Sequence, residues 1–434
     1  MYRKAYKKLL EWKSSGSRKP LLLLGARQVG KTWLMMEFGK NEYENVVYIN
    51  CDTEVLTKDL FLKDYDIRRL LLGFQAISGE SIEEHKTLII LDEIQEAPRG
   101  IHSLKYFCEN APGYHIVAAG SLLGVTLSQK EPFPVGKVDM LKIYPMDFEE
   151  FLYALNQKPL CDILSESDYG LAEALSVKFT ELLYHYYFVG GMPEVVKLFV
   201  NNGDLNGVRS LQEAIIEAYR NDISKHISKT ESIRIGQVIS SLPSQLAKEN
   251  KKFIYGVAKK GGRAADFELA IQWLVDAGLV YKVCRVNKVA MPLKFYEDIT
   301  AFKLFFLDIG LLCCMAKVPA STILINNDAL SEYKGMVAEE YVAQQLSAAG
   351  IDLYYWSNDN SPAELDFVVQ LGNEVCPIEV KASTNVRGKS IAQFVKENPG
   401  KRGLRYSMLG YKNQGWIINY PLYAVPFSLN NYGD

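Results

Sequence analysis

Short, strongly apolar runs alternate with helical stretches over the first third of the chain. The first run, Leu21–Leu24, consists of four leucines and precedes a glycine-containing loop. Runs of this length without polar positions are typical of strands buried on both faces of a parallel sheet. Further runs lie at 46–50, 87–93, 114–121 and 142–145. The alternation predicts a doubly wound parallel α/β sheet between residues 20 and 155.

The pattern changes after this region. Residues 160–225 have helical spacing without a strand-like run, which predicts a helical subdomain. From 232 to 316, three helical stretches precede two strand-like runs, at 279–286 and 292–296. This order is typical of a winged helix.

The last part of the chain predicts a second α/β domain. A helix is expected at about 334–349, a strand at 352–356, and a hairpin of 364–369 with 375–381. The chain as a whole is therefore expected to be a multi-domain α/β protein. The expected domains are 1–158 (parallel sheet), 159–230 (helical subdomain), 231–318 (winged helix) and 319–434 (second α/β domain).

Composition limits the classes of protein that remain. The formal net charge of −2 over 434 residues argues against a surface that is basic throughout, although a local basic patch remains compatible with it. The seven cysteines include no C-x-x-C pair and favour neither a disulfide framework nor a zinc site. Since no apolar run approaches the ~20 residues that span a bilayer, we expect a cytoplasmic protein without a membrane segment.

The loop after the first leucine run has the spacing G-x-x-x-x-G-K-T. Between a strand and a helix, this spacing is typical of a P-loop, where backbone N–H groups and a helix N-terminus bind phosphate. Lys31 can reach the β- and γ-phosphates, and the Thr32 hydroxyl can bind Mg²⁺. The alternative is an ordinary strand–turn–helix. The residues expected to bind the nucleotide are Gly25, Ala26, Arg27, Gln28, Val29, Gly30, Lys31, Thr32 and Trp33.

Two later strands end in polar residues that suit the same site. The run 87–93 closes on Asp92 and Glu93. Asp92 would hold Mg²⁺, and Glu93 would orient or deprotonate the attacking water as the catalytic base, with Lys31 as its catalytic partner on the phosphate. Ser121 follows the next run and is placed to contact the γ-phosphate or the water. A solvated acidic turn and a helix N-cap are the alternatives.

Several stretches resemble one family of proteins. These are the P-loop and residues 91–98 (LDEIQEAP), 118–124 (AAGSLLG), 144–152 (YPMDFEEFL), 190–196 (GGMPEVV) and 302–312 (FKLFFLDIGLL). They are similar to a prokaryotic AAA+-like ATPase family, most of whose members carry a C-terminal domain of unknown function with a nuclease-like fold. The resemblance implies ATP as the nucleotide and extends, with gaps, over nearly the whole chain.

One position departs from this resemblance. Many relatives have an arginine where this chain has Lys137, and lysine lacks the fork of an arginine finger. Arg27, Arg99 and Arg220 are other cationic candidates, and the sequence does not choose among them. The oligomeric state therefore stays open.

The region expected to form the winged helix carries basic residues. They are Lys259, Lys260 and Arg263 near the third helix, and Lys282, Arg285 and Lys288 near the hairpin. A winged helix can place its third helix in the major groove of DNA. A contact with a protein partner is the alternative, because acidic residues lie among these cations.

The last α/β domain contains a second set of charged residues. Strand alternation puts Glu364 with Asp366, and Glu379 with Lys381, on common faces of the hairpin. Carboxylates beside a lysine suit Mg²⁺ or Mn²⁺, and the lysine could help a metal-bound water attack a phosphodiester. The pattern resembles the PD-(D/E)XK nuclease superfamily. The resemblance implies Asp366, Glu379 and Glu339 as metal ligands, with Glu340 competing for the place of Glu339, and Lys381 as a catalytic residue.

Three functional hypotheses follow. In the first, ATP hydrolysis is coupled to a nuclease-like domain with restriction-endonuclease-like topology that acts on or binds nucleic acid. In the second, the protein is a metal-dependent nuclease that ATP switches, and the C-terminal site carries out the output chemistry. In the third, ATP controls a DNA- or protein-binding switch whose nuclease fold is inactive.

Overall fold

The computed structural model describes residues 1–120, 133–248, 251–324, 331–358, 363–383, 389–398 and 401–429. The chain forms two compact units. We call Tyr2–Tyr144 together with Asp276–Gly278 the N-terminal unit, and Pro145–Val275 together with Leu279–Asp434 the C-terminal unit. Each unit is described by itself.

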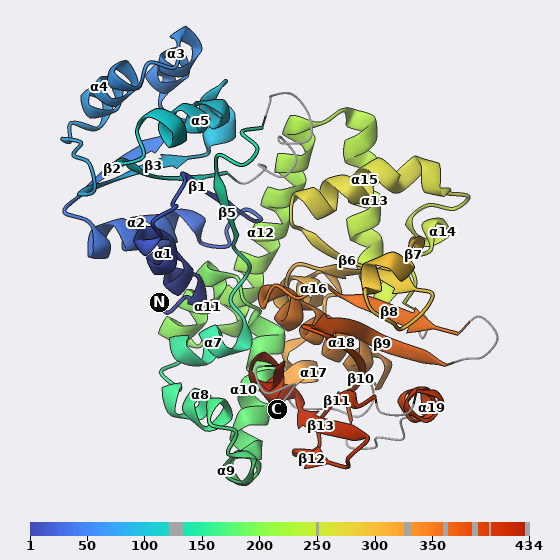
Figure 1. The fold of residues 1–434 in the computed structure, drawn as a ribbon. Coiled ribbons are helices and arrows are strands. Elements are labelled where there is room, and N and C mark those ends of the chain that lie inside the picture. Colours follow the sequence, from blue (N-terminus) through green and yellow to red (C-terminus); the bar gives the residue numbers. More distant parts are fainter. Residues whose placement is uncertain are drawn as a thin grey trace. The chain divides into compact units, whose positions relative to one another are not determined.

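The N-terminal unit is built on a parallel sheet of five strands in the order β2-β3-β4-β1-β5. Helices α1 and α2 lie on one face of this sheet and α5 on the other (Figure 1). The strands are β1 (Leu21–Leu24), β2 (Asn45–Asn50), β3 (Thr87–Asp92), β4 (His115–Ala119) and β5 (Asp139–Lys142). The helices are α1 (Lys4–Ser14), α2 (Lys31–Glu42), α3 (Val55–Lys63), α4 (Ile67–Ser78), η1 (Ile94–Glu96) and α5 (Gly100–Asn110). The predicted parallel α/β sheet is confirmed.

The last strand of this sheet was predicted three residues too late. The sequence pattern indicated 142–145, whereas β5 ends at Lys142. β5 is an edge strand that pairs only with β1 in the described sheet, and Met140 within it is 57% exposed. Because an edge strand has fewer buried positions, its residues show no continuous apolar run. The apolar signal came from Ile143, whose N–H donates to the Leu24 carbonyl just beyond β5.

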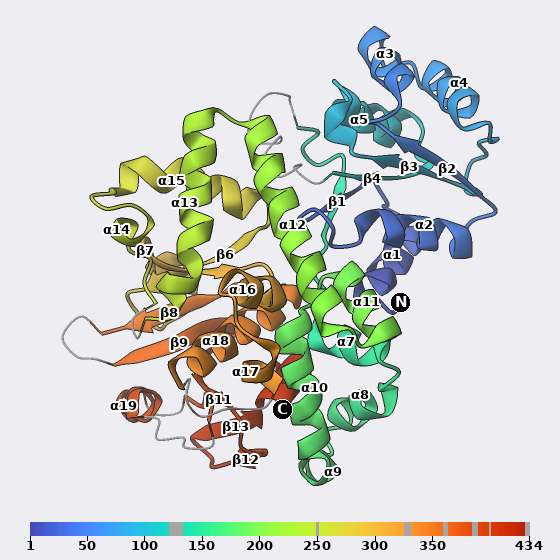
Figure 2. The ribbon, with the colours of Figure 1, turned by 180° about the vertical axis from the view of Figure 1, so that it is seen from behind.

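The first part of the C-terminal unit is helical, as predicted for 160–225. Its long helices include α12 and α13, which lie side by side (Figure 2). The helices are α7 (Phe148–Ala154), α8 (Lys158–Ser165), α9 (Tyr169–Ala174), α10 (Ser176–Val189), α11 (Pro193–Asn202), α12 (Leu205–His226), α13 (Lys229–Leu246), α14 (Tyr255–Ala258) and α15 (Ala264–Asp276).

The second part of this unit contains a mixed sheet of eight strands in the order β12-β13-β11-β10-β9-β8-β6-β7. The strands are β6 (Val280–Val286), β7 (Glu297–Phe306), β8 (Tyr354–Ser357), β9 (Glu364–Leu371), β10 (Glu374–Lys381), β11 (Gly403–Ser407), β12 (Lys412–Asn413) and β13 (Ile417–Pro421). The helices are η2 (Leu293–Tyr296), α16 (Ile309–Met315), α17 (Ala320–Leu324), α18 (Ser331–Ala348), α19 (Lys389–Glu397), η4 (Leu422–Ala424) and α20 (Val425–Ser428). The predicted hairpin of β9 and β10 is confirmed, with Gly372 at positive φ in its turn.

The hairpin of the expected winged helix differs from the prediction. Residues 292–296, predicted as its second strand, form the short helix η2, and the strand that pairs with β6 is β7. β6 also pairs with β8, so that this hairpin belongs to the same sheet as β9 and β10. The apolar residues of 302–306 are buried in β7. The sequence could not show this pairing because the partner strand β8 lies about 70 residues further along the chain.

A cluster of buried polar groups organises the C-terminal unit. Asp308 is fully buried at the N-cap of α16 and accepts hydrogen bonds from the N–H of Gly191 at 2.6 Å, the N–H of Leu311 at 3.0 Å and Gln344 Nε2 at 3.2 Å. Burial raises the pKa of Asp308, while these donors lower it. A buried carboxylate is tolerated when hydrogen bonds replace its water. The cluster therefore holds three separate segments at fixed positions.

The same cluster includes Tyr186 of α10. Its hydroxyl donates to the Met146 carbonyl at 2.6 Å and accepts from Nε2 of Gln344 at 3.0 Å and of Gln345 at 3.2 Å. Gln345 also accepts from the N–H of Phe148 at 2.7 Å. We call these residues, with Asp308 and Gly191, the Asp308 cluster. The cluster connects helix α18 to the stretches 144–152, 190–196 and 302–312. The family resemblance included these stretches but gave them no role.

Gly190→Ala is expected to lower the free energy of unfolding of the C-terminal unit by about 2–4 kcal/mol, because of steric conflict and backbone strain. Gly190 has φ 75°, and a Cβ there would lie 2.2 Å from Asp308 Oδ1. Gly203→Ala is the matched control, since Gly203 has φ 62° and no atom within 4 Å of an added Cβ. The control is expected to cost about 1 kcal/mol. Equal losses in urea denaturation would contradict the role of the cluster.

Candidate functional site

The P-loop connects β1 to α2 and approaches the segment after β5 very closely. A Cβ at Gly25 would lie 2.2 Å from the Ile143 carbonyl oxygen, so that only glycine fits. Gly25, Gln28 and Gly30 all have positive φ, and Gly30 is the N-cap of α2. The free N–H groups of the first turn of α2 therefore belong to the end of the loop, where an anion binds favourably.

Lys31 is folded back onto its own loop. Its Nζ donates to the carbonyl oxygens of Gly25 and Ala26, each at 2.8 Å, and the side chain is buried. Burial lowers the pKa of Lys31 to about 8, and the nearby Glu93 and Asp92 oppose this shift. A buried ammonium with only backbone carbonyls as direct partners is a strong phosphate ligand. The role of Lys31 on the β- and γ-phosphates stays a prediction.

Asp92 lies beside Thr32, although 60 residues separate them in sequence. Thr32 Oγ1 donates to Asp92 Oδ2 at 2.7 Å, and Tyr48 Oη donates to the same oxygen at 3.1 Å. Asp92 is 3% exposed at the end of β3. A hydroxyl and a carboxylate oxygen in contact are the hard donors that Mg²⁺ prefers. The residues thus fit the metal that their types suggested.

Glu93 occupies a strained position directly after β3. Its φ is 49°, in the left-handed region that is uncommon for residues other than glycine. The Oε2 atom accepts a hydrogen bond from Gln95 Nε2 at 2.6 Å. Strained residues at strand ends are frequent in active sites. The backbone therefore turns the Glu93 carboxylate away from the strand direction and holds it through Gln95.

Strand β4 lies between β1 and β3 in the sheet. A residue that follows β4 is consequently next to both the P-loop strand and the Asp92 strand. Ser121, predicted to fill this position, lies outside the described residues. Its role stays a prediction.

Two residues that support the site, one at the P-loop and one at Asp92, had no signal in the sequence. Arg3, before α1, donates to the Val29 carbonyl at 3.1 Å and to the Tyr144 carbonyl at 2.7 Å, so that it ties the P-loop to the segment after β5. Tyr48, in β2, binds Asp92, and burial raises the pKa of Tyr48 to about 12. The side chain of Trp33, predicted to bind the nucleotide, is exposed and lines a surface groove with Met36 and Tyr43.

The candidates for an arginine finger are in different situations. Arg99 donates to Tyr65 Oη at 2.9 Å and to the Leu62 carbonyl at 2.7 Å, and so holds the connection between α3 and α4. Lys137 forms an ion pair with Glu109 at 2.9 Å, and Arg220 one with Glu217 at 3.5 Å. Arg27 is exposed on the P-loop. Arg99, Lys137 and Arg220 thus have acceptors within their own units.

The predicted residues of the second site come together in the C-terminal unit, but with lysines among them. Glu339 pairs with Lys251, Glu364 with Lys303, and Glu379 with Lys381 at 3.4 Å. Burial lowers the pKa of Lys303, but Glu364, Glu339 and Asp366 outweigh this and raise it. We call these seven residues, including Asp366, the lysine–carboxylate cluster.

The structure distinguishes Glu339 from Glu340. Glu340 is fully buried and accepts a hydrogen bond from the Phe306 N–H at 3.1 Å; burial raises its pKa well above the usual value. Glu339 instead faces Lys251 and acts on Asp366 electrostatically. Helix register, which the sequence left open, therefore turns Glu339 toward the other carboxylates and Glu340 toward β7.

Asp366 is half-buried and accepts a hydrogen bond from the Val380 N–H at 2.7 Å. Burial and the charge of Glu339 raise its pKa to about 7, while Lys303, Lys381 and Lys251 lower it. In the described ranges, no three His, Cys, Asp or Glu side chains form a group that could hold a metal ion. The metal roles of Asp366, Glu379 and Glu339 thus stay predictions, and with its lysines in place the arrangement does not fit a metal.

The basic residues expected near nucleic acid are only partly available. Lys259, Lys260 and Arg263 are exposed between α14 and α15. Arg285 is paired with Asp298 at 2.9 Å. Lys282 Nζ lies 4.6 Å from the centroid of the Phe302 ring, and Lys288 Nζ lies 5.7 Å from that of the Tyr296 ring. The exposed positive charge therefore concentrates before α15.

Comparisons with known proteins match parts of the chain. Residues 17–152 match the model of an AAA domain, and residues 180–322 and 334–423 match two models described as domains of unknown function, DUF8612 and DUF4143. An uncharacterized protein of Methanocaldococcus jannaschii is 31% identical over 139 residues, which are 31% of this chain and 27% of that protein. The chain thus spans about a quarter of the length of this curated relative.

The N-terminal unit is thus similar to an AAA domain, and we refer to it as the AAA+-like domain. The matched AAA model covers its loop, strands and acidic pair, in agreement with the geometry described above. Solved structures with some similarity include a Walker-type ATPase of Pyrococcus abyssi, with TM-score 0.45 and 13% identity over 73% of this chain and 95% of that one. Another is the Thermotoga maritima RuvB Holliday junction branch migration motor, with TM-score 0.33 and 14% identity over 66% and 90%.

A third solved structure is the Aeropyrum pernix Orc1 protein in complex with DNA, with TM-score 0.28 and 12% identity over 74% of this chain and 92% of that one. In the described part of the chain, no helix has the length and apolar character needed to cross a membrane.

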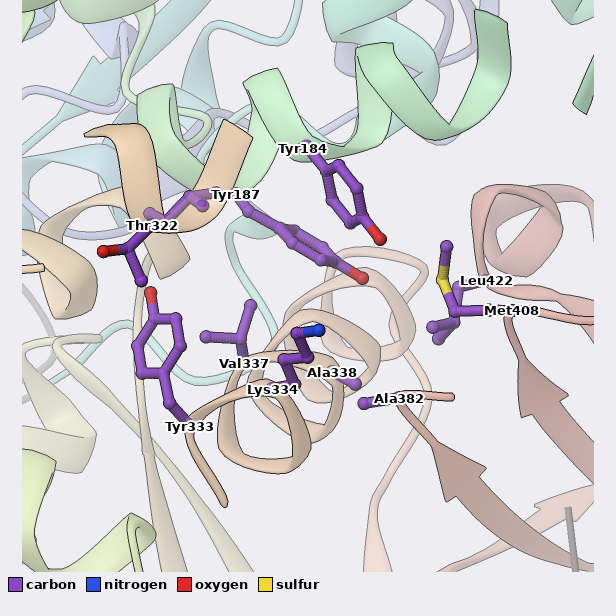
Figure 3. A pocket seen from close by; sticks show the side chains of 11 residues that line it. Tyr184, Tyr187, Thr322, Tyr333, Lys334, Val337, Ala338, Ala382, Met408 and Leu422 are labelled. Atoms are coloured by element: carbon purple, nitrogen blue, oxygen red, sulfur yellow. The ribbon is translucent and has the colours of Figure 1, made fainter. Parts of the chain in front are cut away.

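A tyrosine-lined pocket in the C-terminal unit is separate from the nucleotide site of the AAA+-like domain. Figure 3 shows Tyr184 and Tyr187 of α10 on one side and Val337 and Ala338 of α18 on the other. Its interior volume of about 30 Å³ is room for a water or two. Two residues that line the pocket are sequence neighbours of the lysine–carboxylate cluster: Ala338 precedes Glu339, and Ala382 follows Lys381. Its size excludes a nucleotide as it stands.

The affinity of the AAA+-like domain for ATP without metal is expected to fall as pH rises above about 8. Unliganded Lys31 has a pKa of about 8. Below this value it is already protonated and binds phosphate without taking up a proton. Above it, binding requires proton uptake, so that affinity falls by up to ~tenfold per pH unit. The measurement is the dissociation constant of ATP in EDTA between pH 7.5 and 9.5, and Lys31→Ala should bind weakly with no such dependence.

Proposed function

We propose that this protein binds ATP with Mg²⁺ at the P-loop and hydrolyses it, and that the C-terminal unit is the part that the nucleotide controls. The observation that carries the proposal is the convergence of Lys31, Thr32, Asp92 and Glu93 at the ends of β1 and β3, with Thr32 and Asp92 in direct contact at 2.7 Å. These residues come from two distant segments. Their meeting at one edge of the sheet is what phosphoryl transfer to water needs.

Each residue has a distinct part in the proposed reaction. Lys31 leaves the carbonyls of Gly25 and Ala26 and donates to the β- and γ-phosphate oxygens, where it stabilises charge in the transition state. Thr32 and Asp92 would hold Mg²⁺, which would supply positive charge to the phosphate groups when bound. The first-turn N–H groups of α2 orient the phosphates.

Glu93 is the proposed catalytic base. Its carboxylate takes a proton from the attacking water or orients that water for an in-line attack on the γ-phosphorus. The hydrogen bond from Gln95 fixes the direction of the carboxylate. Tyr48 and Arg3 position the site without contacting the reacting atoms, since Tyr48 binds Asp92 and Arg3 binds the loop carbonyl of Val29.

Glu93→Gln is expected to reduce ATP hydrolysis by ~10²–10³-fold while ATP binding remains, because the amide cannot accept the proton. Lys31→Ala is expected to lose both binding and hydrolysis. Glu96→Gln, in the same short helix η1, is the control and should keep the wild-type rate. Steady-state phosphate release and binding of a fluorescent ATP analogue separate these outcomes. Hydrolysis by Glu93→Gln at the wild-type rate would exclude Glu93 as the base.

The proposed output of the C-terminal unit is binding of nucleic acid through a winged helix and a nuclease-like domain of the PD-(D/E)XK type. The hairpin β9–β10, with Asp366, Glu379 and Lys381, supports the nuclease-like assignment, and α13, α14, α15 and the β6–β7 pair support the winged helix. Pairing of the carboxylates with lysines favours binding over cleavage in the state described. A protein partner is the alternative target.

Lys259→Glu combined with Lys260→Glu is expected to weaken binding to duplex DNA by at least ~10-fold and to reduce the salt slope by about two. Both side chains are exposed before α15. Lys7→Glu with Lys8→Glu makes the same charge change at adjacent exposed positions of α1 and serves as the control. The measurement is fluorescence anisotropy over a range of salt concentrations. Equal weakening by both pairs would reject a DNA contact at this turn.

A further inference from the structure

Three acidic side chains in the lysine–carboxylate cluster each pair with a different lysine. Lys381 pairs with Glu379 two residues earlier on the same strand. The other two lysines come from outside the β9–β10 hairpin. Lys303 lies on β7 and pairs with Glu364, whereas Lys251 lies before α14 and pairs with Glu339. The carboxylates are thus balanced by cations that the chain itself supplies.

Lys251 is unusual because it is a lysine whose side chain is almost fully buried. Its side chain is 9% exposed and its partner Glu339 is 6% exposed. Lysine is almost never buried to this extent without a partner, since removing its charge from water is costly. The backbone beside it is anchored, because the Phe253 N–H donates to the Phe302 carbonyl at 2.8 Å. The ammonium group is therefore held against the carboxylate by the local chain.

The carboxylates retain unused acceptors. Glu339 Oε2 and Glu379 Oε2 are buried and have no hydrogen-bond partner in the described protein. Glu379 is 4% exposed. A buried carboxylate oxygen without a partner is costly and would be stabilised by a cation or a hydrogen-bond donor. Both atoms belong to residues of the type that binds hard divalent cations.

We propose that the ammonium group of Lys251 occupies the place of a divalent cation beside Glu339, so that the cluster is neutralised from within and closed to metal. Lys251 is a better candidate for this role than Lys303. Its partner Glu339 has an unused oxygen, and Lys251 lies in a connection between two helices. Lys303 lies within β7 and is 1% exposed, so that the sheet fixes its backbone and its surroundings leave it almost no contact with solvent.

The proposal has a physical consequence for the nuclease-like domain. With Lys251 in place, a divalent cation near Glu339 meets a positive charge at contact distance and is repelled. The described residues accordingly contain no group of three acidic or other ligating side chains that could hold a metal. Removal of the Lys251 charge leaves too little positive charge near Glu339, Asp366 and Glu379. Mn²⁺ can then replace the missing charge.

The test compares Lys251→Met with Lys252→Met, in which the neighbouring exposed lysine receives the same substitution. Both proteins are studied without nucleotide, with MnCl₂ or with EDTA. We expect Lys251→Met in EDTA to melt roughly 5–15 °C below wild type, because Glu339 loses its partner. Mn²⁺ should restore at least half of this loss. In wild type and Lys252→Met, Mn²⁺ should change the melting temperature by less than ~2 °C.

Bound Mn²⁺, measured by electron paramagnetic resonance, gives a second readout. Lys251→Met should bind one more Mn²⁺ than Lys252→Met, and this site should disappear in the double variant Lys251→Met/Glu339→Gln. Cations at Thr32 and Asp92 are common to all variants and cancel in the difference. Should Lys251→Met fail to fold, Lys251→Gln retains a hydrogen-bond donor without the charge and is expected to gain the same site.

The proposal would be overturned if neither Lys251 variant bound an additional Mn²⁺. It would also be overturned if wild type already bound Mn²⁺ at the Glu339-dependent site with the same stoichiometry. Lys251 would then be an ordinary partner in a buried ion pair. ATP hydrolysis by the same preparations reports on the AAA+-like domain separately, so that a failure here leaves the proposed ATPase function intact.

Discussion

The buried carboxylate of Asp308 is the constraint on which the C-terminal unit depends. It lies without solvent contact and collects donors from Gly191, Leu311 and Gln344. A buried charge of this kind is stable only while its donors remain in place, because each lost hydrogen bond exposes the cost of desolvation. The segments that contribute donors are therefore fixed relative to one another, and helix α18 is fixed with them.

The position of α18 in turn decides the chemistry of the lysine–carboxylate cluster. Gln344 and Gln345 hold its C-terminal half in the Asp308 cluster, and Glu339 and Glu340 lie one turn earlier on the same helix. The rotation set by the glutamines places Glu339 toward Lys251 and Glu340 toward the backbone of β7. One buried polar cluster thus determines which of two adjacent glutamates can meet a cation.

The two charged centres of the protein use lysine in opposite ways. Lys31 is buried against backbone carbonyls, and burial lowers its pKa to about 8, so that an incoming phosphate improves its surroundings. Lys303 is buried against carboxylates, which raise its pKa and leave it fully compensated. The first arrangement prepares a binding site for an anion. The second closes a set of carboxylates against cations.

The sequence by itself determined the elements and residue types that local rules control. The four-leucine strand, the Gly25–Thr32 spacing, the acidic end of β3 and the β9–β10 hairpin were all visible, because burial, turn geometry and phosphate binding each restrict residues over short spans. Only the tertiary structure decided the position of β7, the sharing of one sheet by β6 and β9, the support of the P-loop by Arg3, and the pairing of Lys251 and Lys303 with carboxylates. The contacts of Arg3 with Val29, of Lys303 with Glu364 and of Lys251 with Glu339 join residues that are 26, 61 and 88 positions apart. The free energy of such contacts depends on burial and distance in the folded chain, which no local pattern of residues records.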